Sequence, residues 1–430
     1  MKVFYESREV AEIAPGKDGA ATMTYNTDWQ GTQGAFPVST RMPLEVARHG
    51  AGEVLPWVAN LLPESQQLEM VARATGASQA DPLALLARIG RDTSGAMSFS
   101  ERGFTRMTTR EVPDEAALEQ IIQELPQKPF LVGEDGVSMS LAGVQSKIGV
   151  HVSAEGMISI PVDGAPSTWI LKPDSGSLPG GVYNEALCLR LAHFVGLAAP
   201  EVRVGRAGAR RYLLVKRYDR RQQGESWRRL HQEDMCQALG RLPSAKYERN
   251  ETGQRGPTVR DIVGVMRSLD PLRGVLSIFD YVIFNAIACN TDAHAKNYSV
   301  MVTASGASLA PIYDVMCAKL WPDITSKQAM SLATKWEGVY FKGRHWQREA
   351  ALCGLNSTAA LRRVEMLCKA TMKHLPQAVE EVIAMDPDAE HWVREVEKYI
   401  AERATFLVNG LAEQDPNATT WARARLDALG

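Results

Sequence analysis

The sequence predicts an α+β fold in which a small β-rich part precedes a helical part. Three observations lead to this prediction. Residues 1–30 alternate short β-prone runs with turn residues, residues 137–218 return to strand-like runs, and most of the chain beyond residue 230 follows helical periodicity. The chain has 430 residues, and at roughly 100 to 200 residues per domain this length predicts two or three lobes.

The N-terminal residues are expected to form a mixed module that ends near residue 126. Strand-like runs at 3–5, 10–13 and 21–25, with turn residues at 15–19 between the last two, predict small antiparallel hairpins. Apolar residues at helical spacing then predict helices at 55–62, 82–89 and 118–125.

The rest of the chain changes from strands to helices. Strands are expected at 149–152, 157–160, 169–171 and 212–215, interrupted by one helix at 184–194 that stops at Gly196. Beyond residue 230 the expected helices cover 272–289, 359–374, 376–384 and 391–409.

The charge balance argues against a protein that binds nucleic acid by itself. The 48 basic and 50 acidic side chains give a net charge of −2, whereas a protein that binds nucleic acid by itself usually carries a basic excess. Any such binding would need a local patch, and the arginine-rich stretch 206–229 is a candidate, although a solvated strand and loop face is the simpler interpretation.

The cysteines and the hydrophobic pattern point to the cytoplasm. The 6 cysteines include no C-x-x-C pair, which is typical of reduced thiols rather than of a disulfide framework or a zinc site. The N-terminus has no apolar signal-peptide core and no stretch approaches 18 apolar residues, so neither export nor a membrane span is expected.

The most informative motif is Asp292-Ala-His-Ala-Lys-Asn297, which lies between an apolar helix and a probable strand. Protein kinases use the spacing Asp-x-x-x-x-Asn in their catalytic loop, where the Asp accepts the substrate hydroxyl proton and the Asn holds a metal ion. The strand-like runs 298–302 and 308–310 then predict a hairpin that returns Asp314 to the loop. These residues could form one Mg²⁺-nucleotide site, although both aspartates could instead be loop and turn residues that cap helices.

A phosphoryl-transfer site also needs a cation for the phosphates. Lys172 ends an apolar strand, as the strand lysine of protein kinases does, and Glu185 on the next helix is a candidate ion-pair partner. The segment 138–147 contains small residues and Lys147, but its spacing alone favours an ordinary turn over a phosphate loop.

Taken in order, these pieces resemble the HipA family of bacterial serine/threonine kinase toxins, through nearly the whole chain. The resemblance is carried by Asn60–Ser65 (NLLPES), Ile89–Asp92 (IGRD), Ser140–Gln145 (SLAGVQ), Asn184-Glu185, Lys216–Arg221 (KRYDRR), Leu230–Gln237 (LHQEDMCQ), Thr291–Asn297 (TDAHAKN) and Tyr313-Asp314. It implies a two-lobed, protein-kinase-like fold with an extra N-terminal module at 1–126, a nucleotide-binding part of the N-lobe at 127–245 and a helical C-terminal lobe at 246–430.

The resemblance also implies roles for individual residues. Asp292 would be the catalytic base, Asn297 and Asp314 would carry Mg²⁺, and Lys172 would contact the phosphates of ATP. The phosphate loop would comprise Ala142, Gly143, Val144, Gln145, Ser146 and Lys147, and the adenine hinge would comprise Lys216, Arg217 and Tyr218. The nucleotide site would be completed by His294, Ala295, Lys296 and Tyr313.

Ser140 matches the serine that HipA-like kinases phosphorylate on themselves, an event that ejects the phosphate loop and stops activity. The chain departs from the family at Ser146, where Glu is frequent, and at Lys216, where the hinge is usually acidic. The first departure leaves open whether Ser140 or Ser146 is modified. The second need not alter adenine binding if the backbone makes that contact.

The resemblance finally implies a cytoplasmic toxin that phosphorylates an aminoacyl-tRNA synthetase, typically the glutamyl enzyme, and causes growth arrest and persistence. Its partner would be a HipB-like helix-turn-helix antitoxin, through which alone it would reach operator DNA. Two alternatives stay open: a non-enzymatic corepressor that stabilises the operator-bound antitoxin, and a small-molecule phosphotransferase.

Overall fold

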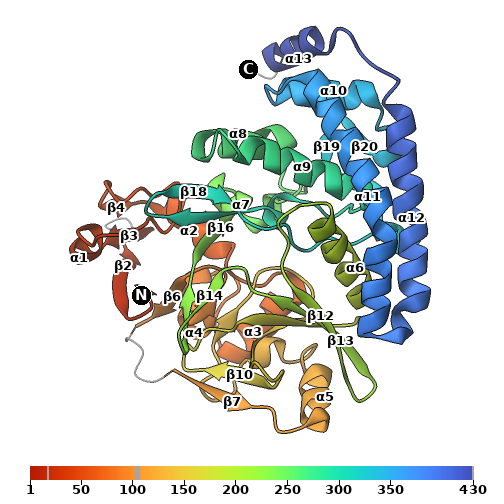
Figure 1. The fold of residues 1–430 in the computed structure, drawn as a ribbon. Coiled ribbons are helices and arrows are strands. Elements are labelled where there is room, and N and C mark those ends of the chain that lie inside the picture. The colour runs from red at the N-terminus through yellow and green to blue at the C-terminus, as the bar shows by residue number, and fades with distance from the viewer. Residues whose placement is uncertain (17–18, 102–106, 429–430) are drawn as a thin grey trace. The chain divides into compact units, whose positions relative to one another are not determined.

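The computed structural model describes residues 1–16, 19–101 and 107–428, so the predicted turn residues Lys17 and Asp18 lie outside the described part. The chain forms two compact units (Figure 1). The first unit comprises residues 1–174, 205–243 and 299–310, and the second comprises 175–204, 244–298 and 311–430. The three domains proposed from the sequence, and the two boundaries between them, stay predictions.

The N-terminal hairpins expected from the sequence are confirmed. They form a five-stranded sheet in the order β4-β3-β2-β1-β6, with β1 antiparallel to both β2 and β6. Its strands are β1 Lys2–Tyr5, β2 Arg8–Pro15, β3 Ala21–Tyr25, β4 Arg48–His49 and β6 Met97–Ser100. The helices of this region are α1 Thr27–Gln30, α2 Ala51–Ala59, α3 Ser65–Thr75 and α4 Pro82–Ile89.

A second sheet of the first unit has six strands in the order β12-β13-β11-β9-β10-β7. Its strands are β7 Thr108–Glu111, β9 Ile148–Val152, β10 Ile158–Val162, β11 Trp169–Pro173, β12 Val202–Ala207 and β13 Arg210–Lys216; α5 Glu115–Glu124 and the 3₁₀ helix η1 Pro129–Leu131 precede β9. One hydrophobic core runs through both sheets, from Val3 and Trp57 to Ile148 and Leu171. The N-terminal module and the six-stranded sheet therefore bury their apolar faces together.

Three small sheets complete the first unit. The parallel pair β5 Asp92–Thr93 and β8 Met139–Ser140 joins distant segments, and β14 Arg220–Gln223 pairs with β15 Ser226–Arg229. The hairpin β17 Ser299–Thr303 and β18 Gly306–Leu309 is present as predicted. Its first strand pairs with β16 His231–Asp234, which is followed by the short helix α7 Met235–Ala238. The strand β16 lies in the part beyond residue 230 that was expected to be mostly helical.

The second unit is mainly helical. Its helices are α6 Gly181–Phe194, α8 Val259–Leu269, α9 Gly274–Ile287, α10 Gly343–Leu352, α11 Ser357–Met385, α12 Glu390–Gly410 and α13 Ala418–Asp427. It also contains the strand pair β19 Lys327–Leu332 and β20 Lys335–Glu337, which the sequence pattern did not predict, and the 3₁₀ helices η3 Ala295–Asn297, η4 Ala318–Leu320, η5 Gly338–Tyr340 and η6 Pro387–Ala389. A further 3₁₀ turn, η2 Pro243–Ala245, begins at the end of a first-unit segment.

The long helix α11 corrects one prediction. Two helices were expected at 359–374 and 376–384, but α11 continues through Pro376 as one element. It packs against α6, α9, α10 and α12 and lies alongside α12 (Figure 1). Packing on several sides offsets the hydrogen bond that a proline removes from a helix. The α+β class is confirmed, and none of the helices in the described ranges is both long and apolar enough to span a membrane.

Candidate active site

The residues predicted to do chemistry fall into both units. Asp292, Asn297 and Asp314 belong to the second unit, whereas Lys172 and the segments 142–147 and 216–218 belong to the first.

The catalytic-loop motif follows α9 and precedes β17. Asp292 is open to solvent, with 57% of its side chain exposed, whereas Asn297 on η3 is buried. The Asn297 amide nitrogen donates to the Asp292 carbonyl oxygen at 2.8 Å. This bond closes the Asp-x-x-x-x-Asn segment on itself and leaves the amide oxygen of Asn297 as the atom suited to a cation.

Asn290 connects this loop to Asp314. Its side-chain oxygen accepts from the Asp292 backbone N–H at 3.1 Å, and its side-chain nitrogen donates to the Asp314 carbonyl oxygen at 3.4 Å. The same nitrogen donates to the Asn285 side chain on α9 at 2.8 Å. We call Asn285, Asn290 and Asn297 the asparagine scaffold. It ties the two aspartates of the predicted site to one rigid helix with neutral amides only.

The segment 246–247 holds the same loop from another direction. The Tyr247 hydroxyl donates to Asp292 Oδ1 at 2.6 Å, and the Lys246 carbonyl oxygen accepts from Ala295 N at 3.2 Å. The Tyr247 ring also packs edge-on against His294, with ring centroids 5.0 Å apart. The carboxylate of Asp292 is therefore oriented although it faces solvent.

The environment of His294 favours the neutral form of its ring. Burial lowers its pKa well below the ordinary value, and the positive charges of Lys246 and Lys296 lower it further. Its Nδ1 atom is buried and has no hydrogen-bond partner within the described ranges. Because buried polar atoms are nearly always satisfied, this atom is available to a polar group of a ligand.

Asp314 and Tyr313 lie on the segment that returns to the loop. The Tyr313 hydroxyl donates to the Lys296 carbonyl oxygen at 2.7 Å. Asp314 adopts a left-handed backbone conformation with φ 57°. Non-glycine residues in this region are uncommon and are found where surrounding structure enforces them, which includes active sites.

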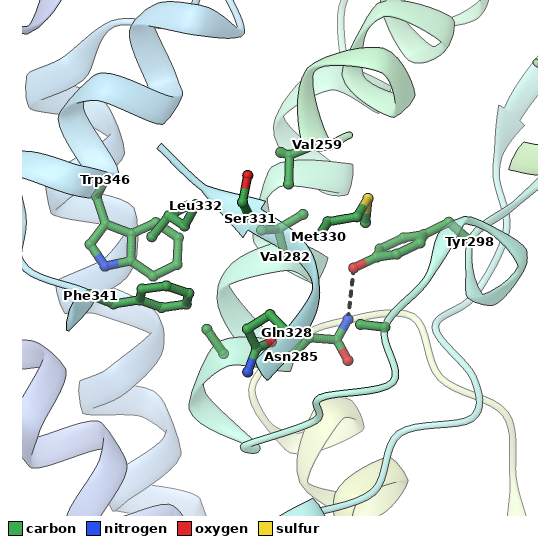
Figure 2. A pocket seen from close by; sticks show the side chains of 12 residues that line it. Val259, Val282, Asn285, Tyr298, Gln328, Met330, Ser331, Leu332, Phe341 and Trp346 are labelled. Carbon is green, nitrogen blue, oxygen red and sulfur yellow. Dashed lines mark hydrogen bonds between the residues drawn. The ribbon is translucent and has the colours of Figure 1, made fainter. Parts of the chain in front are cut away.

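A small pocket of the second unit is lined by Ala293 of the catalytic loop and by side chains of α9, β19 and α10, most of which are drawn in Figure 2. Tyr298 and Asn285 face each other across it and share a hydrogen bond of 3.2 Å, while Phe341 and Trp346 cover one side. Its volume of about 20 Å³ has room for about one water molecule. Asn285 of the asparagine scaffold lines the pocket, which is too small for a nucleotide.

The predicted phosphate loop is folded against the N-terminal module. The Gly143 carbonyl oxygen accepts from Glu64 N at 3.1 Å, and the Val144 carbonyl oxygen accepts from Gln67 Nε2 at 2.7 Å. The Lys147 ammonium group donates to the Ala142 carbonyl oxygen. Gly143 has φ 108°, a backbone conformation that residues with a side chain rarely adopt, so this position favours glycine.

The two candidate phosphorylation sites differ in exposure. Ser140 is fully buried in β8, and its hydroxyl donates to the Leu61 carbonyl oxygen at 2.7 Å. Ser146 is half-buried on the loop. The Ser140 hydroxyl is therefore closed to solvent in this structure, whereas Ser146 is partly accessible.

Lys172 and the predicted hinge lie on neighbouring strands of the six-stranded sheet. Lys172 on β11 is buried and stands opposite Leu213 on β13. Lys216 ends β13, and its ammonium group lies 5.7 Å from the centre of the Trp169 ring. Tyr218 donates its hydroxyl to the Gln232 side chain. Lys172 and Glu185 belong to different units, so their ion pair stays a prediction.

Both interpretations of the arginine-rich stretch 206–229 are wrong for three of its arginines, which are buried. They surround two buried carboxylates in the first unit, in a set that we call the arginine–aspartate cluster: Asp92, Arg217, Asp219, Arg220 and Arg229. Asp92 also accepts from the Ser167 hydroxyl at 2.6 Å. The cluster joins β5 of the N-terminal module to β14 and β15. Its role is therefore to hold these segments together rather than to bind a partner.

The side chain of Arg217, a residue of the predicted hinge, is engaged within the cluster. Its guanidinium group donates to Asp219 at 2.7 and 2.9 Å and to Ser167 at 2.9 Å, and its backbone N–H donates to the Thr168 carbonyl oxygen at 2.9 Å. A nucleotide contact by Arg217 would have to use its carbonyl oxygen.

Sequence reasoning missed two residues that position the loop. Asn290 precedes Asp292 by two residues, and an Asn that accepts from the backbone two residues later is a known turn pattern, so this signal was present. Tyr247 lies 45 positions from Asp292 in the chain, and no local pattern links them.

Comparisons with known proteins show which family this chain resembles. Residues 1–100 match the family model described as the HipA N-terminal domain, and residues 139–375 match the HipA-like C-terminal domain. The candidate kinase Y4mE of Sinorhizobium fredii is 33% identical over 391 residues, which cover 89% of this chain and 92% of that protein.

Two comparisons concern Shewanella oneidensis. The serine/threonine-protein kinase toxin HipA of that bacterium is 31% identical over 386 residues, covering 84% of each chain. The solved complex of HipA, HipB and operator DNA from Shewanella oneidensis MR-1 contains a chain of the same fold, with a TM-score of 0.82 and 25% identity over 96% of this chain and 98% of that one.

Proposed function

This chain belongs to the HipA family of serine/threonine-protein kinases, and from this premise we propose that it is the toxin of a toxin–antitoxin system. It transfers the γ-phosphoryl group of ATP to a serine or threonine of a protein target. The observation that carries the proposal is the link through Asn290, which holds Asp292 and Asp314 to one support in the second unit.

Asp292 is proposed as the catalytic base. Its carboxylate is solvent-exposed, so a substrate hydroxyl can approach it, and Tyr247 fixes one of its oxygens. In kinases an aspartate at this place in the loop orients the hydroxyl and accepts its proton, while the transferred group needs little covalent help from the protein. Positioning and charge neutralisation then supply most of the rate enhancement.

The donor set fits Mg²⁺. Asn297 and Asp314 offer an amide oxygen and a carboxylate, both hard ligands, and the Asn297 nitrogen is already engaged with the Asp292 carbonyl. Within residues 1–16, 19–101 and 107–428, no group of three or more His, Cys, Asp or Glu side chains is arranged to hold a metal. The ion would therefore need phosphate oxygens as further ligands, and when bound it offsets charge on the transferred group.

The remaining predicted residues are proposed to bind ATP. Lys172 contributes a cation for the phosphates, and residues 142–147 contribute backbone N–H groups. The adenine hinge is assigned to residues 216–218, with its contact made by the backbone. His294, Ala295, Lys296 and Tyr313 complete the nucleotide site, and the unsatisfied ring nitrogen of His294 supports that assignment.

Self-inhibition is proposed to act through Ser140. A phosphate on this serine cannot stay in its buried position, so β8 must leave its place and draw the adjoining phosphate loop with it. Modification of the half-buried Ser146 would not need that displacement. We assign the inhibitory event to Ser140 for this reason.

The partners proposed for the chain come from the family. They are a HipB-like antitoxin, operator DNA reached only through that antitoxin, and an aminoacyl-tRNA synthetase, most simply the glutamyl enzyme, as the phosphorylated target in the cytoplasm. The solved Shewanella oneidensis complex supports the first two, because its HipA shares this fold.

Incubation of the purified chain with labelled ATP, Mg²⁺ and candidate synthetases tests the proposal, with phosphosites mapped by mass spectrometry. Asp292→Asn is expected to lower incorporation by about 10³-fold or more, whereas Asp323→Asn, at an exposed loop position of the same unit, should leave it unchanged. Undiminished incorporation by Asp292→Asn would refute the assignment of the base. Transfer to small hydroxyl compounds and not to proteins would favour a small-molecule phosphotransferase, and absence of any turnover would favour a corepressor.

A further inference from the structure

Two cysteines bracket the segment that contains the proposed catalytic residues. Cys289 lies three residues before Asp292, and Cys317 lies three residues after Asp314. Both belong to the second unit and both are buried as free thiols. The backbone brings them together, because Ala318 N donates to the Cys289 carbonyl oxygen at 3.1 Å.

Their side chains interact directly. A hydrogen bond from the Cys317 thiol lowers the pKa of Cys289, against the opposing effect of burial, and the positive charges of Arg403 and Lys319 lower it further. Arg403 is fixed close by, donating to the Ala286 and Gly338 carbonyl oxygens at 3.0 and 2.8 Å. The pair therefore couples a polarised sulfur to a neighbouring thiol.

The other buried cysteines of the second unit lack this environment. Burial dominates at Cys188 and Cys353 and raises the pKa of each, and it raises the pKa of Cys368 to about 12. Such thiols are poor nucleophiles. Among the cysteines of the second unit, Cys289 is thus the one with a lowered pKa, whereas the pKa of its partner Cys317 is raised by its hydrogen bond to Cys289 and by burial. Cys289 is therefore the thiol that would react first, and Cys317 lies beside it as the second thiol of the pair.

We propose that Cys289 and Cys317 form an oxidisable pair that a hydroperoxide converts into a disulfide. The Cys289 thiolate attacks the peroxide and the O–O bond breaks. The leaving hydroxide (or alkoxide) takes up the proton that the Cys289 thiol released, which gives a sulfenic acid and one water (or alcohol). The Cys317 sulfur then attacks the Cys289 sulfur, the S–O bond breaks, and hydroxide leaves as water with the Cys317 proton. The two thiols lose two electrons in total, and the peroxide gains them.

The disulfide would alter the proposed active site, a consequence that rests on the proposed function. Cys317 is fixed because its backbone N–H and carbonyl oxygen both bond to the Asn184 side chain, at 2.7 and 2.9 Å. A covalent bond requires the sulfurs to come closer than a hydrogen bond does. Cys289, whose backbone is already left-handed at φ 57°, must therefore move, and Asn290 and the catalytic loop follow it.

The test treats the purified full-length chain with hydrogen peroxide, blocks remaining thiols by alkylation and maps peptides without reduction. We expect a Cys289–Cys317 cross-link that dithiothreitol reverses, the same cross-link in Cys368→Ser, and none in Cys317→Ser, where Cys289 should accumulate sulfenic acid. Absence of the cross-link in the unsubstituted chain, or pairing of Cys289 with Cys188 instead, would overturn the proposal; neither outcome depends on a variant that folds.

Activity is measured in parallel. Oxidation is expected to lower phosphoryl transfer by about tenfold or more, because a displacement of about 1 Å can cost about 100-fold, and dithiothreitol should restore it. A cross-link without loss of activity would refute the effect on the site. A chain that never phosphorylates but still cross-links would refute the kinase assignment and leave the thiol pair intact.

Discussion

The arginine–aspartate cluster of the first unit and the asparagine scaffold of the second satisfy buried polar groups in opposite ways. The cluster packs three guanidinium groups around two carboxylates, and every one of these side chains is buried. The scaffold uses neutral amides, and the charged group it supports, Asp292, reaches solvent. A dense set of buried charges therefore marks a joint between segments, whereas a neutral support beneath an exposed carboxylate is the arrangement suited to catalysis.

The buried charges of the arginine–aspartate cluster shift the pKa values of its members. Burial opposes the ionisation of Asp92, but attraction to Arg220, Arg217 and Arg229 outweighs it, so the pKa of this carboxyl is lowered. Burial and repulsion by Arg217 lower the pKa of Arg220 to about 10, although attraction to Asp219 and Asp92 opposes this shift. The carboxylate at the centre of the cluster is thus held ionised and cannot exchange protons near neutral pH.

Removal of Asp92 tests the structural role of the cluster and should give the largest effect. Asp92→Ala leaves three buried arginines with one carboxylate, and loss of one member of a buried ion pair typically costs about 3–5 kcal/mol of unfolding free energy. Because the folded-state pKa is lowered, the contribution of Asp92 is present at neutral pH and is lost as the pH falls below roughly 4.

Urea-induced unfolding of Asp92→Ala at pH 7 and pH 3 measures both parts of this prediction. Glu12→Gln, at an exposed position of the same unit, serves as the control and should match the unsubstituted chain. A loss below about 1 kcal/mol at pH 7 would mean that the cluster is no more than an incidental ion pair.

Removal of Asn290 tests the scaffold. Asn290→Ala breaks the bonds to Asp292, Asp314 and Asn285, and misplacement of reacting groups by about 1 Å can lower kcat by about 100-fold. The KM for ATP should change far less, since the described side-chain bonds of Asn290 all lie within the second unit, to Asn285, Asp292 and Asp314.

Steady-state kinetics and a melting curve separate this effect from unfolding. Asn356→Ala is a suitable comparison, because Asn356 caps α11 through a 2.9 Å bond to Ala359 N and its loss should lower stability while kcat stays constant. If Asn290→Ala retained full kcat, the link that Asn290 makes between Asp292 and Asp314 would not be needed for catalysis.

The contrast also explains what could be predicted from the sequence. The spacing of Asp292 and Asn297, the hairpin at 299–309 and the helix at 82–89 depend on local signals, such as the Asp81 cap and Pro82 at the helix start. The roles of Arg217, Arg220 and Arg229 could not be found in this way, because their partner Asp92 lies more than 120 positions away. The pairing of β16 with β17 was missed for the same physical reason.

Removal of the Tyr247 hydroxyl sharpens the comparison further. Tyr247→Phe keeps the ring against His294 but loses the 2.6 Å bond to Asp292. The rotational freedom gained by the carboxylate should lower kcat by about three- to tenfold with the KM for ATP unchanged. Tyr340→Phe, at an exposed ring elsewhere in the second unit, is the matched control, and equal kcat values for the two variants would show that Tyr247 does not orient Asp292.

Glu349 is a buried carboxylate of the second unit that lacks the cations Asp92 has, and it should give the smallest effect. It accepts from Ala333 N at 2.6 Å, and burial together with the negative charge of Glu248 raises its pKa to about 7. Because the folded-state pKa is raised, its contribution to stability is full below the unfolded-state pKa of about 4.3 and is lost as the pH rises through about 7.

Glu349→Gln removes this titration while it keeps an oxygen for Ala333 N. We expect the variant to gain about 1 kcal/mol of unfolding free energy at pH 8 relative to the unsubstituted chain and to lose about 1 kcal/mol at pH 5, whereas Glu251→Gln, at an exposed position, changes nothing at either pH. The gain stays small because the new amide N–H needs a partner that the carboxylate did not. A stability difference that is the same at both pH values would mean that Glu349 is already ionised at pH 5. Its hydrogen bonds and the positive charge of Arg255 would then suffice to hold a buried carboxylate without the close ion pairs that Asp92 makes.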